Sequence, residues 1–243
     1  MMRKHVAAAG MYIRINILRV IAILLVTVTA EVLLFCRAAS MPNTGLEDVI
    51  DRSGVVWAMA AAFILLTVQL CAAGGDRGGR QNYTLQRLAL QERTVTFWQM
   101  AVNALFYLLF WTVQGLLLII LCTAVRDPDD VLSGQALFLA CWRSPLLHGL
   151  IPMGEVLVWI RNAVFCAALG IVTAKFSWCR RRGKFGVGVL FAAAACLLSF
   201  LREVGKTVED TLVILFLLVV VAAAVTGIVT EEEEYDEKDQ TVS

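Results

Sequence analysis

Long apolar runs, separated by short polar segments, dominate the chain. A membrane-spanning helix needs about 20 mainly apolar residues, and six runs reach or approach that length. They cover residues 15–36, 55–73, 98–125, 151–174, 187–201 and 211–229. The fifth run is the shortest, and it becomes a full span only with the flanking side chains of Lys184, Phe185 and Arg202. The pattern therefore predicts about six transmembrane helices.

Helices are the expected form of these runs because a backbone surrounded by lipid must satisfy its hydrogen bonds internally. The strands of a membrane barrel would alternate polar and apolar residues, and these runs do not. We therefore predict an all-α integral membrane protein, a bundle of about six helices that forms one polytopic domain over residues 1–230. The acidic segment 231–243 is expected to be a disordered cytoplasmic tail.

The first run has two interpretations. A basic flank precedes it, and the small residues around Ser40 could be a signal-peptidase site. The run is nevertheless longer than the roughly 7 to 15 apolar residues of a signal peptide, and it starts late in the chain. We expect it to be retained as a membrane span.

The basic residues orient the bundle, because Lys and Arg collect in cytoplasmic loops. If the chain starts inside, thirteen of its 21 Lys and Arg residues fall in cytoplasmic segments and six in outside loops. We therefore expect a multi-pass protein of the cell membrane with both termini in the cytoplasm. The net charge of +1 hides this asymmetry and carries no information about nucleic acid. We expect no nucleic-acid partner for this membrane protein.

Composition agrees with a lipid environment, since 59% of residues are hydrophobic and 17% are charged, against about half and a quarter in soluble domains.

The seven cysteines are scattered and there are two histidines, so we expect neither a metal site nor a cofactor. Hydrolase motifs are absent and no aspartate lies inside a predicted span, so no enzyme is expected. The sequence Gly205-Lys206-Thr207 ends like a phosphate-binding loop, but Phe200 replaces the leading glycine. Any ATP hydrolysis must then come from another chain.

Several polar residues fall inside the predicted spans, where each costs free energy unless it is paired. They are Glu31, Gln99, Asn103, Gln114, Glu155 and Arg161. Gln99, Asn103 and Gln114 share one face of the third span. Such residues either form hydrogen bonds between helices or line a path for a solute. Glu155 and Arg161 are too far apart around their helix to pair well, whereas an ion pair between Glu31 and Arg161 across helices would remove the cost of both charges.

The apolar stretch 135–142, after the third span, also has two interpretations. It is either a separate helix that lies on the membrane or re-enters it, or an early start of the fourth span that Pro152 interrupts. Both interpretations stay open at the level of sequence.

The segment between the second and third spans predicts a short amphipathic helix. Four glycines let the chain turn, Asn82 or Thr84 can cap the helix, and Leu85, Leu88 and Ala89 then share one face. Such a helix either lies along the membrane surface or docks on a cytoplasmic partner.

The residues of this segment carry a resemblance to a known family. Asn82 to Leu88, followed by Glu92-Arg93 and Trp98-Gln99, resembles the corresponding loop of small permease subunits of bacterial ABC transporters, in the exporter-type permease family. The resemblance implies six spans, a separate ATP-binding subunit and a coupling helix in this loop. By that likeness the docking residues would be Tyr83, Leu85, Arg87, Leu88 and Glu92. The family's re-entrant element precedes the last span, whereas here that loop is short and the apolar outside segment follows the third span.

Two functional hypotheses follow. The first is a permease subunit that couples to a separate ATPase and moves an unknown solute, as a homo- or hetero-dimer with another permease chain, because six helices rarely enclose a large path. The second is a non-transporting membrane anchor or accessory subunit of a membrane complex. A wide polar interior would favour transport, and a dry packed interior would favour the anchor.

Overall fold

The computed structural model describes residues 2–41, 46–73, 92–124, 133–201 and 207–242, and every element in this part of the chain is a helix. The long helices are α1 (Met2–Ala39), α3 (Val55–Ala72), α5 (Glu92–Ala124), α8 (Val156–Arg181) and α10 (Thr207–Val242). The shorter ones are α2 (Leu46–Ser53), α6 (Ser133–Arg143), α7 (Pro145–Leu150) and α9 (Gly188–Leu201). The prediction of an all-α protein is confirmed.

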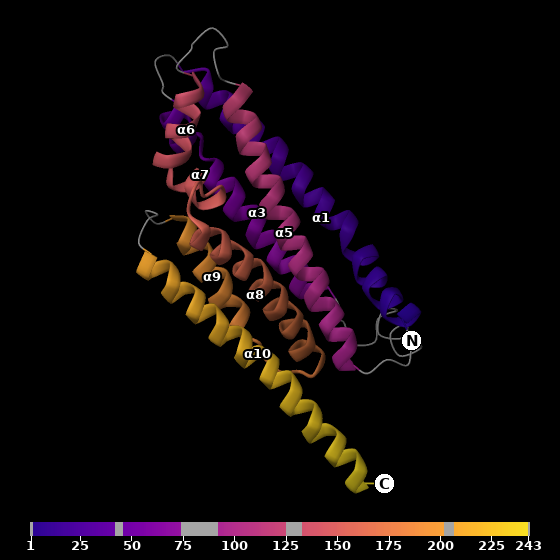
Figure 1. Cartoon of the computed structure of the whole chain (residues 1–243). Coiled ribbons are helices and arrows are strands. Elements are labelled where there is room, and N and C mark those ends of the chain that lie inside the picture. The colour runs from indigo at the N-terminus through magenta and orange to yellow at the C-terminus, as the bar shows by residue number, and fades with distance from the viewer. Residues whose placement is uncertain (1, 42–45, 74–91, 125–132, 202–206, 243) are drawn as a thin grey trace.

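Within the described residues, five helices are long and apolar enough to cross a membrane, and they belong to α1, α3, α5, α8 and α10. The fifth predicted span is α9, which is apolar but has only 14 residues. These helices make the chain a multi-pass membrane protein. The two termini lie at one end of the bundle (Figure 1), here called the terminal end, and α2, α6 and α7 gather at the other, here called the distal end.

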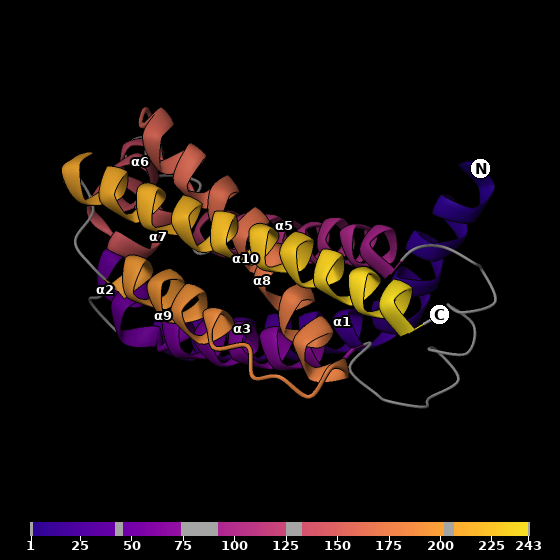
Figure 2. The same ribbon diagram turned by 90° about the horizontal axis from the view of Figure 1, so that it is seen from below.

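Helix α8 is the centre of the bundle. It packs against α3, α5, α9 and α10, while α1 packs against α3 and α5 (Figures 1 and 2). The contact between α5 and α8 is very close at Gly170, where an added Cβ atom would lie 2.5 Å from the backbone nitrogen of Ala104. Small residues commonly permit such approaches between membrane helices.

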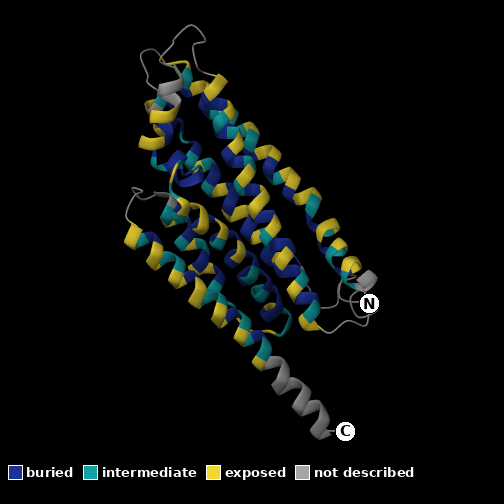
Figure 3. Ribbon diagram, in the orientation of Figure 1, coloured by how far each residue is buried: buried dark blue, intermediate teal, exposed yellow. Residues whose placement is uncertain are grey.

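The central helix α8 is more buried than the outer helices α1 and α10 (Figure 3). Over half of the apolar window of α8 is buried, against 17% for α10 and 22% for α1. Leu18 and Leu25 of α1 and Val219 of α10 are exposed. Apolar side chains on these outer faces are stable in contact with lipid or with another membrane chain.

The distal end contains two short helices that were not predicted, α2 and α7, and one, α6, that was among the interpretations of the sequence. Gly54, with φ +74°, separates α2 from α3, and Gly154, with φ +88°, precedes α8. Both angles lie in the left-handed region, which favours glycine. The apolar stretch 135–142 belongs to α6, a helix separate from α8, so its interpretation as an early start of the fourth span is wrong. The break falls at Ser144, before the short buried helix α7, and again around Pro152.

The first and last helices, α1 and α10, extend beyond the apolar runs that predicted them. Helix α1 is an integral part of the bundle, because Val20, Glu31 and Phe35 are fully buried. Helix α10 continues to Val242, where the sequence predicted a disordered tail from residue 231. Glu and Lys are strong helix formers, and a preceding apolar helix removes the cost of nucleation.

Candidate functional site

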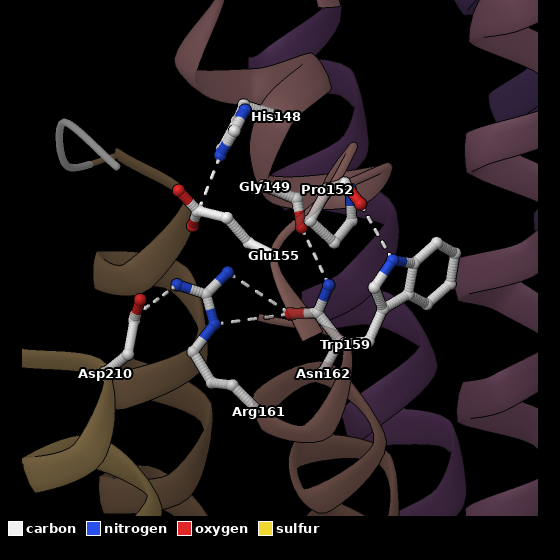
Figure 4. A network of polar contacts seen from close by, with 8 residues as sticks. All are labelled: His148, Gly149, Pro152, Glu155, Trp159, Arg161, Asn162 and Asp210. Atoms are coloured by element: carbon white, nitrogen blue, oxygen red, sulfur yellow. Dashed lines mark hydrogen bonds and ion pairs between the residues drawn. The ribbon is translucent and has the colours of Figure 1, made fainter. Parts of the chain in front are cut away.

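A polar network lies at the distal end, between the starts of α8 and α10 (Figure 4). Arg161 Nη1 contacts Asp210 Oδ1 at 2.7 Å, and the two side chains are 3% and 12% exposed. Asn162 Oδ1 accepts hydrogen bonds from Arg161 at 3.2 and 3.3 Å. The amide nitrogen of Asn162 donates to the carbonyl oxygen of Gly149 at 2.7 Å. The network therefore ties α7 to both α8 and α10.

Further contacts hold α7 and the loop after it in place. Glu155 Oε2 lies 3.5 Å from Nε2 of the buried His148. Trp159 Nε1 donates to the carbonyl oxygen of Pro152 at 2.8 Å, and Trp111 Nε1 donates to that of Leu150 at 3.2 Å. The two indole rings meet edge to face with their centroids 5.3 Å apart. Helix α7 and the segment after it are thus fixed to α5 and α8.

The predicted ion pair between Glu31 and Arg161 is wrong, because each residue has another partner. The side-chain amide of Gln114 faces both carboxylate oxygens of Glu31, at 2.8 and 2.9 Å with its nitrogen turned toward them. The partner of Arg161 is Asp210, which the sequence analysis did not select because it lies just before the last apolar run. The available signal was its place in the chain, since α8 and α10 begin at the same end of the bundle, but packing decides which side chains meet there.

The remaining predicted polar residues form hydrogen bonds between helices. Gln99 donates to the carbonyl oxygen of Ala73 at 3.1 Å, and Ser177 donates to the same oxygen at 3.2 Å. These bonds satisfy a carbonyl group that the end of α3 leaves without an intrahelical partner. Asn103 donates to Thr173 Oγ1 at 3.0 Å, which joins α5 to α8. The polar face of α5 is therefore used to join α1, α3 and α8.

A charged cluster lies at the terminal end, where α5 begins and α8 ends. Glu92 contacts Arg181 at 3.5 Å and Arg182 at 3.0 Å. The guanidinium of Arg182 lies over the ring of Trp178, 4.1 Å from its centroid. An acidic group at a helix N-terminus and basic groups at a helix C-terminus are each favoured by the helix dipole. The other predicted docking residues, Tyr83, Leu85, Arg87 and Leu88, lie outside the described residues.

An apolar cavity of about 360 Å³ lies between α3, α5, α7, α8 and α9. Phe110, Phe165 and Cys166 are among its buried walls, and Leu146 and Leu150 of α7 line it toward the distal end. Trp57 and Ile64 of α3 also line it, although they are 71% and 49% exposed at the surface of the molecule. The cavity therefore meets the apolar outer surface of the bundle along α3.

Comparison of the chain with protein-family models, with curated proteins and with solved structures finds no match.

Proposed function

We propose that this chain is the membrane-spanning permease subunit of an ABC transporter, which uses a separate cytoplasmic ATPase to move a solute. The single observation that carries the proposal is the contact of Glu92 with Arg181 and Arg182. Glu92 is the last of the predicted docking residues, and it is joined here to the end of the central helix α8. Force applied to that segment by a partner would thus reach α5 and α8 together.

The two helices also lead to the distal end. Trp111 of α5 and Asn162 of α8 both bind backbone oxygens of the segment that forms α7, at Leu150 and Gly149. Helices transmit displacement well because their backbone hydrogen bonds make them stiff. A movement of the α5–α8 pair would accordingly shift α7, which we propose as the element that opens the distal end.

The proposal includes a second permease chain. The outer faces of α1 and α10 are broad and apolar, and exposed residues such as Leu25 and Val219 lie on them. The bilayer covers such faces in a monomer, and a second chain would cover one of them in a dimer. We expect both termini, and hence the ATPase, on the cytoplasmic side.

One observation favours the alternative, a non-transporting anchor or accessory subunit. The approach of Gly170 to Ala104 closes the space between α5 and α8, and the polar residues of α5 are bonded to neighbouring helices. An interior of this kind suits a packed anchor. A permease with this interior would have to move solute at an interface with its second chain, or along the cavity beside α3.

Affinity purification from the native membrane tests the proposal. The wild-type chain should retain a protein that mass spectrometry identifies as an ATP-binding subunit, and Leu88→Asp should lose it because a charge enters the apolar face of the docking helix. Gln86→Asp is the matched control, since it adds the same charge outside that face. Retention of no ATP-binding subunit by the wild-type chain would overturn the permease proposal and leave the accessory subunit.

A further inference from the structure

We propose that the cavity between α3, α5, α7, α8 and α9 binds one acyl chain of a phospholipid from the leaflet at the distal end. The binding is independent of the function proposed above. Only the further step, that this lipid is the transported solute, rests on the permease proposal.

The lining chemistry suits a hydrocarbon chain. Almost every wall residue is apolar, and the polar ones are engaged elsewhere: Gln114 with Glu31, Asn162 with Gly149, and Tyr107 with Thr67 at 3.0 Å. Polar solutes would find few free hydrogen-bonding groups on these walls, and burying them unpaired is costly. Apolar cavities of this kind also stay dry.

The size of the cavity fits one extended chain. Along α3 its wall runs from Val56 to Ile64, which at about 1.5 Å per residue is about 12 Å of depth. One leaflet contributes about half of a hydrocarbon core that is about 30 Å thick. The volume of about 360 Å³ is more than twice the roughly 150 Å³ of an engineered apolar cavity that binds benzene.

The cavity lies where an acyl chain can enter it directly from the membrane. Trp57 is the third residue of α3, and a tryptophan near the end of a span commonly lies at the level of the headgroups. Trp57 and Ile64 are exposed on the surface that lipid contacts, so a chain enters sideways without crossing water. The headgroup would then remain beside Trp57 and the adjoining helix α2. Leu146 and Leu150 of α7 line the cavity at this same, distal end.

Photolabelling in nanodiscs tests the proposal with the full chain alone and without ATP. The probe is a phospholipid with a diazirine at the middle of one acyl chain, and peptide mass spectrometry locates the adducts. The cavity residue Phe165 should be labelled although it is only 2% exposed, whereas Leu217, equally buried but outside the cavity, should not. Exposed Val219 of α10 reports ordinary contact with the bilayer.

Two variants that fill the cavity complete the test. Ala60→Trp from α3 and Leu197→Trp from α9 should each abolish labelling of Phe165 and leave that of Val219 unchanged. Ala222→Trp, on the exposed face of α10, is the matched control and should change neither. Absence of label on Phe165 in the wild-type chain, or its persistence in both variants when they elute as folded protein, would overturn the proposal. Neither result depends on whether an ATPase binds.

Discussion

Arg161 of α8 and Asp210 of α10 form a buried ion pair, with 2.7 Å between Nη1 and Oδ1. The pair joins the central helix of the bundle to its last span, close to where both helices begin at the distal end. A charge at this depth is tolerated only with a partner, because its desolvation is costly. The pair therefore fixes the position of α10, a helix that is otherwise largely exposed.

Removal of one partner is expected to be far more destructive than removal of both. Asp210→Asn should lower the free energy of unfolding by about 3 kcal/mol, because the buried Arg161 loses the carboxylate that faces it at 2.7 Å. The double variant Arg161→Met/Asp210→Leu should recover most of the loss. Unfolding in mixed detergent micelles measures both.

A surface pair on α2 is the control for this prediction. Arg52 and Asp48 are 3.9 Å apart and mostly exposed, so Asp48→Asn should change stability by less than about 1 kcal/mol. Equal losses for Asp48→Asn and Asp210→Asn would contradict the assignment of Arg161–Asp210 as a buried structural pair.

The contact between Glu31 and Gln114 predicts a difference between two conservative substitutions. Gln114→Leu should cost about 1 to 3 kcal/mol, because the buried carboxyl of Glu31 loses its amide partner. Glu31→Gln should cost less, since two amides can still form a hydrogen bond. The same unfolding measurement applies. A larger loss for Glu31→Gln than for Gln114→Leu would show that the charge of Glu31 has another role.

The close approach of α5 and α8 predicts different outcomes for two glycine substitutions. Gly170→Ala should destabilise the bundle by about 1 to 3 kcal/mol, because the new methyl group collides with the backbone of Ala104 and pushes the helices apart. Gly115→Ala is the matched control on α5, where the added Cβ would meet only Ile151, at 3.5 Å. Thermal unfolding in detergent compares them, and equal melting temperatures would mean that α5 and α8 are less closely packed.

The predicted orientation can be read by cysteine labelling on intact cells, with Cys36 replaced beforehand. A membrane-impermeant maleimide should label Arg52→Cys in α2 from outside, and Arg77→Cys only after permeabilisation. Burial raises the pKa of the Cys141 thiol in α6, so its reactive thiolate forms only at higher pH. Cys141 should therefore stay unlabelled at pH 7. The opposite pattern for the two introduced cysteines would place the termini outside.

The helical nature of the bundle and five of the six predicted spans could be predicted from sequence, because long apolar runs indicate both. The sixth predicted span is α9, the weakest of the runs in the sequence, and its 14 residues are fewer than a full span needs. The pairing of Arg161 was not predictable, because the rotation and neighbours of each helix are decided by packing over the whole bundle. Helix α2 was missed because its eight residues are fewer than the 11 to 18 over which a helical period is usually judged, although Leu46, Val49 and Ile50 share one face.

The most direct test of the central claim is ATP hydrolysis by the chain purified from its native membrane with its bound partner and placed in nanodiscs. The permease proposal predicts hydrolysis by the wild-type complex, its loss in Leu88→Asp and its retention in Gln86→Asp. Wild-type preparations that hydrolyse ATP no faster than empty nanodiscs would contradict it.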